Sequence, residues 1–215
     1  MKRFLEACCT SSEAASEAER GGASRIELCE QLEVGGVTPS EDLIKATLDA
    51  CKTAKVNVLV RPRGGDFVYD EAETQQMLQD IRMCKRCGVN AVVIGALRKD
   101  GSIDSDIMHR LIKEARPLSV TFHRAFDECN DVESCLEDII SLGCDRLLTS
   151  GHEADAYTGR FTIARLVEQA AGRIVILAGC GVRPHNIAEL ESVTHAPEFH
   201  SSCWQSMSEL VNNSL

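Results

Sequence analysis

RIELCEQLEVGGVTPS, which runs from Arg25 to Ser40, contains the structural unit that the rest of the chain repeats. Its first five residues have the character of a short strand, with a glutamate in the middle and a cysteine at the end, and the glycines that follow indicate a loop. The residues Thr38-Pro39-Ser40-Glu41 then fit a capping box with proline at the first helical position. The stretch therefore predicts a strand, a loop and a helix start, in that order.

Short β-rich segments alternate with helical segments along the whole chain. The predicted strands begin near Phe4, Arg25, Val56, Ala91, Ser119, Arg146, Ile174 and Glu198. The predicted helices span Ser11 to Arg20, Pro39 to Ala50, Asp70 to Cys87, Ser105 to Ala115, Val132 to Leu142, Thr158 to Ala171 and Asn186 to Val193. This alternation predicts an α/β fold, a (β/α)8 barrel of the TIM type, as one domain over residues 1–215.

An open doubly wound sheet is the alternative architecture, but no glycine-rich dinucleotide loop follows the first predicted strand. After the eighth predicted strand the chain continues only with CWQSMSELVNNSL. We therefore expect the C-terminal helix of the barrel to be short or incomplete.

The composition excludes several classes of partner. The chain has 33 acidic and 23 basic residues, a formal net charge of -10, and no long run of Lys or Arg, so neither nucleic acid nor an anionic membrane is expected to bind it. No stretch approaches the roughly 18 apolar residues of a membrane span, and the N-terminus turns acidic before it could form a signal-peptide core. We expect a cytoplasmic protein whose 11 scattered cysteines are mostly free thiols.

Polar residues in the predicted strands indicate which side chains point into the barrel, because the face toward the helices must be apolar. In FLEAC and RIELC this test places Glu6 and Glu27 inside, together with Cys8 and Cys29. On later strands it selects Asn57, Leu59, Arg61 and Arg63, then Ser119, Thr121 and His123, and finally Glu198, His200 and Ser202. The polar residues gather at the C-terminal mouth, where barrels of this type keep their sites.

Charged residues inside a barrel must form ion pairs or serve in binding or catalysis, since an isolated buried charge is costly. Glu6 and Glu27 are available to neutralise Arg61, with Arg63 as a second partner, and this ion pairing is a purely structural role. The same groups can also serve a ligand, and the two roles are compatible.

Cys8 and Cys29 are expected at matching places on neighbouring parallel strands, which lie about 4.8 Å apart. Two thiols this close could share a soft metal such as Cu(I), because thiolates are the ligands that select it. The alternative is that both are small buried apolar side chains, as free cysteines usually are.

Anion binding is a second chemistry that the mouth could support. LAGCGVRPHN, from Leu177 to Asn186, places Gly179 and Gly181 between the seventh predicted strand and a helix. Together with the loop after the eighth strand, which contains Ser202, such loops form the common phosphate site of barrels.

The guanidinium groups of Arg61 and Arg63, in RPRGGD, suit carboxylate or phosphate contacts. His123 could give or take a proton near neutral pH, with Glu6 or Glu27 as a further acid, base or orienting group. A hydrogen-bonded scaffold role is the alternative for His123.

Six segments resemble the CutC family of copper homeostasis proteins and are spread from the first strand to the eighth. They are SRIELCEQLEVGGVTPS, RPRGGDFVY, VTFHRAFDEC, LLTSG, AGCGV and EFHSS. The resemblance implies a TIM-type barrel, a cytoplasmic location and Cu(I) bound through cysteine. Cys8 and Cys29 match the cysteines that such a site would use.

The chain departs from the family pattern in two respects. It carries more cysteines than the family requires, and family members usually continue beyond the HSS segment. An incomplete eighth helix would leave apolar barrel surface for a second copy, so we expect a homo-oligomer. The sequence is consistent with two functions. The first is a Cu(I)-binding protein, and the alternative is an enzyme acting on a small anionic or phosphorylated metabolite at the same mouth.

Overall fold

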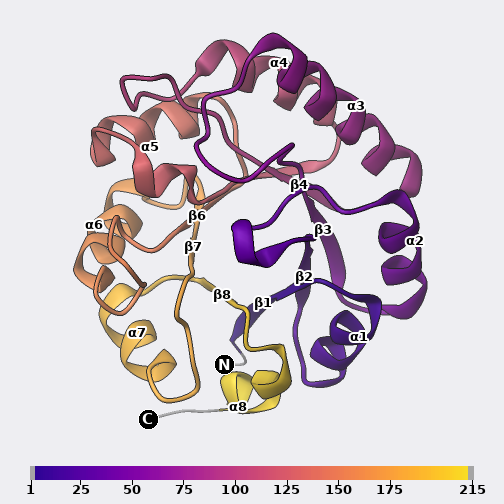
Figure 1. The fold of residues 1–215 in the computed structure, drawn as a ribbon. Helices are drawn as coiled ribbons and strands as arrows, with labels where there is room; N and C mark the ends of the chain where they lie inside the picture. Colours follow the sequence, from indigo (N-terminus) through magenta and orange to yellow (C-terminus); the bar gives the residue numbers. More distant parts are fainter. Residues whose placement is uncertain (1–2, 213–215) are drawn as a thin grey trace.

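Eight parallel strands close into a barrel in the computed structural model, which describes residues 3–212 (Figure 1). The strands are β1 (Phe4–Cys9), β2 (Arg25–Leu28), β3 (Lys55–Leu59), β4 (Ala91–Ile94), β5 (Ser119–Phe122), β6 (Arg146–Thr149), β7 (Val175–Ala178) and β8 (Glu198–Ser201). Each strand pairs with its neighbour in the sequence, and β1 pairs with β8 to close the ring. The predicted (β/α)8 barrel is confirmed.

Helices surround the barrel and connect its strands. They are α1 (Ser12–Arg20), α2 (Glu41–Ala50), α3 (Glu71–Cys87), α4 (Ser105–Ala115), α5 (Val132–Ser141), α6 (Arg160–Ala170), α7 (Ile187–Thr194) and α8 (Met207–Asn212). The expectation of a short C-terminal helix is confirmed, since α8 has only 6 residues. No helix among residues 3–212 combines the length and the apolar character needed to span a bilayer.

The start of α2 differs from the prediction. Ser40, not Thr38, is the N-cap residue, and its hydroxyl accepts a hydrogen bond from the Leu43 amide. The Thr38 hydroxyl is occupied elsewhere, because it accepts from the Arg61 amide at 3.0 Å and donates to Asp80. Thr38 and Pro39 therefore belong to the loop that leads from β2 to α2.

Apolar side chains fill the layer between strands and helices, and Ile26, Leu28 and Val58 on the outward face are fully buried there. Inside the barrel the packing is different. A small separate apolar cluster contains Cys8, Cys29, Leu59 and Val93. The inward parity predicted for Cys8 and Cys29 is confirmed by this cluster.

Glu19, in the last turn of α1, holds the loop that precedes β3. Its carboxylate accepts hydrogen bonds from the amides of Lys52, Thr53 and Ala54 and from the Thr53 hydroxyl. Partial burial opposes ionisation, but these donors outweigh it and lower the pKa of Glu19 to about 2. An ionised Glu19 therefore stabilises the folded state.

We predict that Glu19→Gln lowers the free energy of unfolding at pH 7 by about 1 kcal/mol, a value that allows for solvent screening at a partly exposed site. The pKa is depressed on folding, so the wild-type advantage is present above the unfolded value of about 4.3 and fades as pH falls toward 2. Urea unfolding at pH 7 and pH 3 measures both effects. Glu17→Gln, on the same helix, is the matched control, and an equal loss at the two pH values would contradict the prediction.

Candidate functional site

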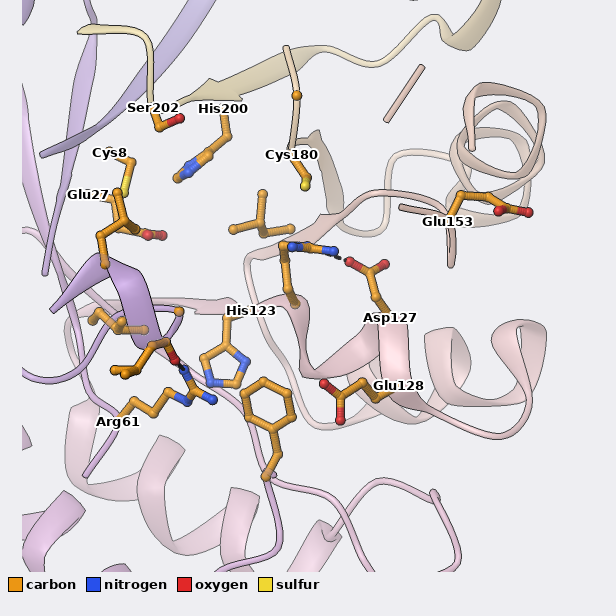
Figure 2. Close-up of a pocket in the computed structure, with 18 of the residues that line it drawn as sticks. Cys8, Glu27, Arg61, His123, Asp127, Glu128, Glu153, Cys180, His200 and Ser202 are labelled. Atoms are coloured by element: carbon orange, nitrogen blue, oxygen red, sulfur yellow. Dashed lines mark hydrogen bonds and ion pairs between the residues drawn. The ribbon is translucent and has the colours of Figure 1, made fainter. Parts of the chain in front are cut away.

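A cavity of about 660 Å³ opens at the C-terminal mouth of the barrel, within the 300–1,000 Å³ typical of small-molecule sites. Its wall includes the side chains of Cys8, Glu27, Arg61, His123 and His200, which come from β1, β2 and β8 and from the loops after β3 and β5. Figure 2 shows Cys8 beside Glu27 with the His200 ring turned toward them, while Arg61 and His123 lie in another part of the wall. The predicted mouth is therefore a real cavity with polar walls.

Beneath this cavity lies a buried ion-pair network centred on Glu6. One oxygen of Glu6 pairs with Arg25, and the other lies 2.7 Å from Nδ1 of His200. Arg25 also donates to Glu198 at 2.5 Å. Burial raises the pKa of Glu6, but the charge of Arg25 and the contacts with His200 outweigh it and hold the pKa at about 2.

The predicted pairing of Glu6 with Arg61 is wrong. Glu6 is level with Arg25 in the β1–β2 register and is fully buried, and it does not line the cavity within the described residues. Arg25 points inward from the neighbouring strand and forms the ion pair with Glu6 that was predicted for Arg61. Glu6 therefore belongs to the floor beneath the mouth.

Arg61 has a different set of partners. Its guanidinium donates to the carbonyl oxygens of Val34, Gly36 and Gly65 and lies 4.6 Å from the centre of the Phe67 ring. The side chain is 5% exposed and pairs with no carboxylate among residues 3–212. Arg61 therefore holds the loops after β2 and β3 through their carbonyl oxygens and not through an ion pair.

Arg63, predicted to bind an anion, lies outside the cavity wall as described. It pairs with Glu73 and Asp66 and stacks on Tyr69. The strand ends at Leu59, so the alternation that placed Arg63 beside Arg61 does not extend that far. A pairing of Arg63 with Glu6 or Glu27 is therefore also wrong.

Three potential metal ligands converge in the wall. Cys8, Glu27 and His200 each offer one ligand atom, and these atoms lie within 4.8 Å of one another. Cys29 is a fourth neighbour, since its Sγ is 3.8 Å from that of Cys8, but it is 1% exposed and lies under the wall. In the strand register Cys8 is level with Glu27 and not with Cys29, which corrects the expected matching of the two cysteines.

The protonation of these groups follows from their burial. The hydrogen bond with Cys29, burial and the charge of Glu27 raise the pKa of Cys8 well above the ordinary thiol value. Burial raises the pKa of Glu27 to about 7, although His200 opposes the rise. Burial lowers the pKa of His200, but the charges of Glu27 and Glu6 outweigh it, so the net direction is upward. A metal ion would therefore displace protons when it binds.

His123 does not have the acid–base character that the sequence suggests. Burial and the charge of Arg61 lower its pKa to about 3, so the ring is neutral at pH 7. Its Nδ1 accepts from the Ala125 amide at 3.2 Å, which assigns the proton to Nε2. Within the described part of the chain the buried Nε2 has no hydrogen-bond partner, and the side chain of His123 lines the mouth.

The two glycines after β7 have separate roles. Gly181, whose φ is +74°, lines the cavity. Ser202, after β8, also lines it. Gly179 does not line it; a Cβ at Gly179 would lie 2.4 Å from Leu148 and 3.1 Å from the Cβ of His200. Gly179 therefore makes room for His200 to pack.

Sequence reasoning missed the role of Asp127. This carboxylate accepts hydrogen bonds from Arg124, from the Thr149 hydroxyl and from the amide and hydroxyl of Ser150, and so joins the loops after β5 and β6. It also lines the cavity, opposite Cys180 in Figure 2. Asp127 follows the fifth predicted strand, in HRAFD, and this position at the mouth end of a strand could have identified it as a site residue.

Comparison with known proteins gives one consistent result. The model of the CutC family matches residues 3–205. A family protein CutC from Parabacteroides distasonis is 54% identical over 202 residues, covering 94% of this chain and 83% of that protein. The human copper homeostasis protein cutC homolog is 45% identical over 199 residues, covering 93% and 72%.

Solved structures agree with this result. The crystal structure of a CutC protein from Streptococcus agalactiae is 31% identical, with a TM-score of 0.89, and the match covers 94% of this chain and 99% of that one. The aldolase QR15, at 16% identity and a TM-score of 0.74 over 97% of this chain and 94% of that one, shares the fold alone.

We predict that Glu6→Gln lowers the free energy of unfolding at pH 7 by about 3 kcal/mol, because the buried Arg25 then keeps only Glu198 as an ionised partner among the described residues. The depressed pKa of Glu6 means that this difference is full above the unfolded value of about 4.3 and shrinks as pH falls toward 2. Urea unfolding measures it. Glu191→Gln, which breaks the half-exposed pair with Arg3, serves as the control and should cost about 1 kcal/mol or less. A comparable loss in both variants would refute a central role for Glu6.

Proposed function

The chain belongs to the CutC family of copper homeostasis proteins, and on that premise we propose that it binds Cu(I) in the cytoplasm through Cys8 and Cys29 at the mouth of its barrel. The human relative is named for copper homeostasis, which supports copper as the cargo.

The separation of the two sulfur atoms is the observation that carries this proposal. Sγ of Cys8 and Sγ of Cys29 lie 3.8 Å apart. Two metal–thiolate bonds of about 2.3 Å, the length found for zinc, span at most about 4.6 Å, so one ion fits between them. Thiolates are also the ligands that select Cu(I).

The surroundings of the pair favour a soft ion held away from water. Leu59 and Val93 pack against both cysteines, and Cys8 alone of the two reaches the cavity wall. An ion from the cavity would meet Cys8 first and then Cys29. The eleven cysteines are all free, as expected of a protein from a reducing compartment.

Homo-oligomerisation is part of the same proposal. The six-residue α8 is the shortest α-helix among residues 3–212. A second copy of the chain is the partner that would cover the barrel surface beside this helix.

An anion-binding mouth is the second candidate function, and the buried side chains of Arg61 and His123 favour it. Arg61 brings a charge that no carboxylate among residues 3–212 pairs with, and His123 brings a buried Nε2–H donor without a described partner. The cavity is also far larger than an ion needs. If the ligand is a substrate, Glu27 has the pKa of a general acid or base near neutral pH.

We predict that Cys8→Ala and Cys29→Ala each weaken Cu(I) binding by about 100-fold or more, because each removes one of two sulfur ligands. Titration against a competing Cu(I) chelator under anaerobic conditions measures the affinity. Cys9→Ala is the matched control, since Cys9 is on the same strand but packs toward the helices. Unchanged affinity in the Cys8 and Cys29 variants would remove the proposed site.

For the second candidate, we predict that at least one of a panel of small phosphorylated or carboxylated metabolites, tested beside inorganic phosphate, raises the melting temperature. A ligand concentration of about 100 times the dissociation constant stabilises the folded state by about 2.7 kcal/mol. This corresponds to a rise in melting temperature of roughly 5–10 °C for a chain of this size. His123→Leu should reduce the shift, and Arg63→Ala should leave it intact, since Arg63 lies outside the cavity wall. A panel without any stabilising anion would count against this function.

A further inference from the structure

We propose that Cys8, Glu27 and His200 form a site for a borderline divalent metal ion such as Zn²⁺, with one coordination position left open to the cavity. This site goes beyond the Cu(I) proposal and does not depend on it. The ligand is the metal ion, and the open position would take water or an anionic oxygen of a small molecule.

The three side chains come from three adjacent strands. Cys8 is on β1, which pairs with β2, the strand of Glu27, and with β8, the strand of His200. One ligand atom of each lies within 4.8 Å of the others, and the three residues are 5%, 6% and 9% exposed. Ligands bound to one tetrahedral ion at about 2.0–2.3 Å lie about 3.3–3.8 Å apart, so atoms at the 4.8 Å limit must move about 1 Å closer together when the ion binds.

The orientation of His200 is fixed by its neighbours. Its Nδ1 lies 2.7 Å from Glu6, whose second oxygen is fixed by Arg25, and Gly179 leaves the space in which His200 packs. Nδ1 therefore donates to the ionised Glu6, which leaves Nε2 as the ring nitrogen that would bind a metal once any proton on it is displaced. A carboxylate that fixes the other ring nitrogen is the usual partner of a metal-bound histidine.

Glu27 provides an independent sign of a missing ligand. Its Oε2 is buried and has no hydrogen-bond partner in the described part of the chain. Buried polar atoms of native proteins are nearly always satisfied, by protein, water or ion. A cation bound beside Cys8 and His200 would satisfy this oxygen.

The donor types decide which ion fits. One thiolate, one imidazole and one carboxylate form a mixed set that suits Zn²⁺ and similar ions, whereas Cu(I) prefers sulfur alone. Three protein ligands below a cavity leave a fourth position open, as in catalytic zinc sites. Because Cys8 belongs to both sets, a divalent ion here and Cu(I) between Cys8 and Cys29 exclude each other.

Co²⁺ tests the proposal because it replaces Zn²⁺ and reports its ligands by absorption. We expect the reduced full-length protein to bind one Co²⁺ ion, with a thiolate-to-cobalt charge-transfer band and the strong visible bands of four-coordinate cobalt, and to release it to Zn²⁺. Glu27→Gln and His200→Gln should each weaken binding at least tenfold. Cys8→Ala should abolish the charge-transfer band.

Cys29→Ala is the matched control, and it separates the two proposals. It should leave the Co²⁺ spectrum unchanged while it weakens Cu(I). Glu27→Gln is nearly isosteric at an atom without a described partner, and circular dichroism verifies its fold. Wild-type protein without the cobalt bands, or bands that persist unchanged in both Glu27→Gln and His200→Gln, would overturn the site. A Cu(I) affinity unaffected by Cys29→Ala would instead overturn only the two-cysteine site.

Discussion

The buried ion pair between Glu6 and Arg25 is the interaction on which the mouth of this barrel depends. Both side chains are removed from water, at 0% and 1% exposure, so each charge depends on its ion pairing, to which Glu198 adds a second partner for Arg25. Glu6 then uses its second oxygen to hold His200, which faces the cavity. A structural ion pair in the floor thus determines the orientation of a potential ligand above it, and this connects the stability of the fold with its chemistry.

Much of this arrangement was predictable from the alternation of side chains along each strand. The helix-facing positions must be apolar, which placed Glu6, Cys8, Glu27 and Cys29 inside the barrel, and the structure buries all four there. The strands were predictable from a second signal, because the first seven are short segments with apolar residues that are each followed by a predicted helix.

The contacts between side chains of different strands were not predictable, because they depend on the register of neighbouring strands and on loop geometry. The register sets Cys8 level with Glu27, and it sets Glu6 level with Arg25, which displaces Arg61 as the expected partner. Arg63 turns away because β3 ends at Leu59. The neutral state of His123 depends on burial and on the nearby charge of Arg61, and both arise only when distant segments meet.

The two proposed metal sites share Cys8, and their donor atoms differ: two sulfurs in an apolar cluster, or a mixed set of sulfur, nitrogen and oxygen at the cavity wall. X-ray absorption at the copper edge of the Cu(I)-loaded protein tests the central claim most directly. The account predicts two sulfur neighbours and no nitrogen or oxygen in the nearest shell, with one sulfur lost in Cys29→Ala. A nearest shell dominated by nitrogen or oxygen, or one that Cys29→Ala leaves unchanged, would contradict it.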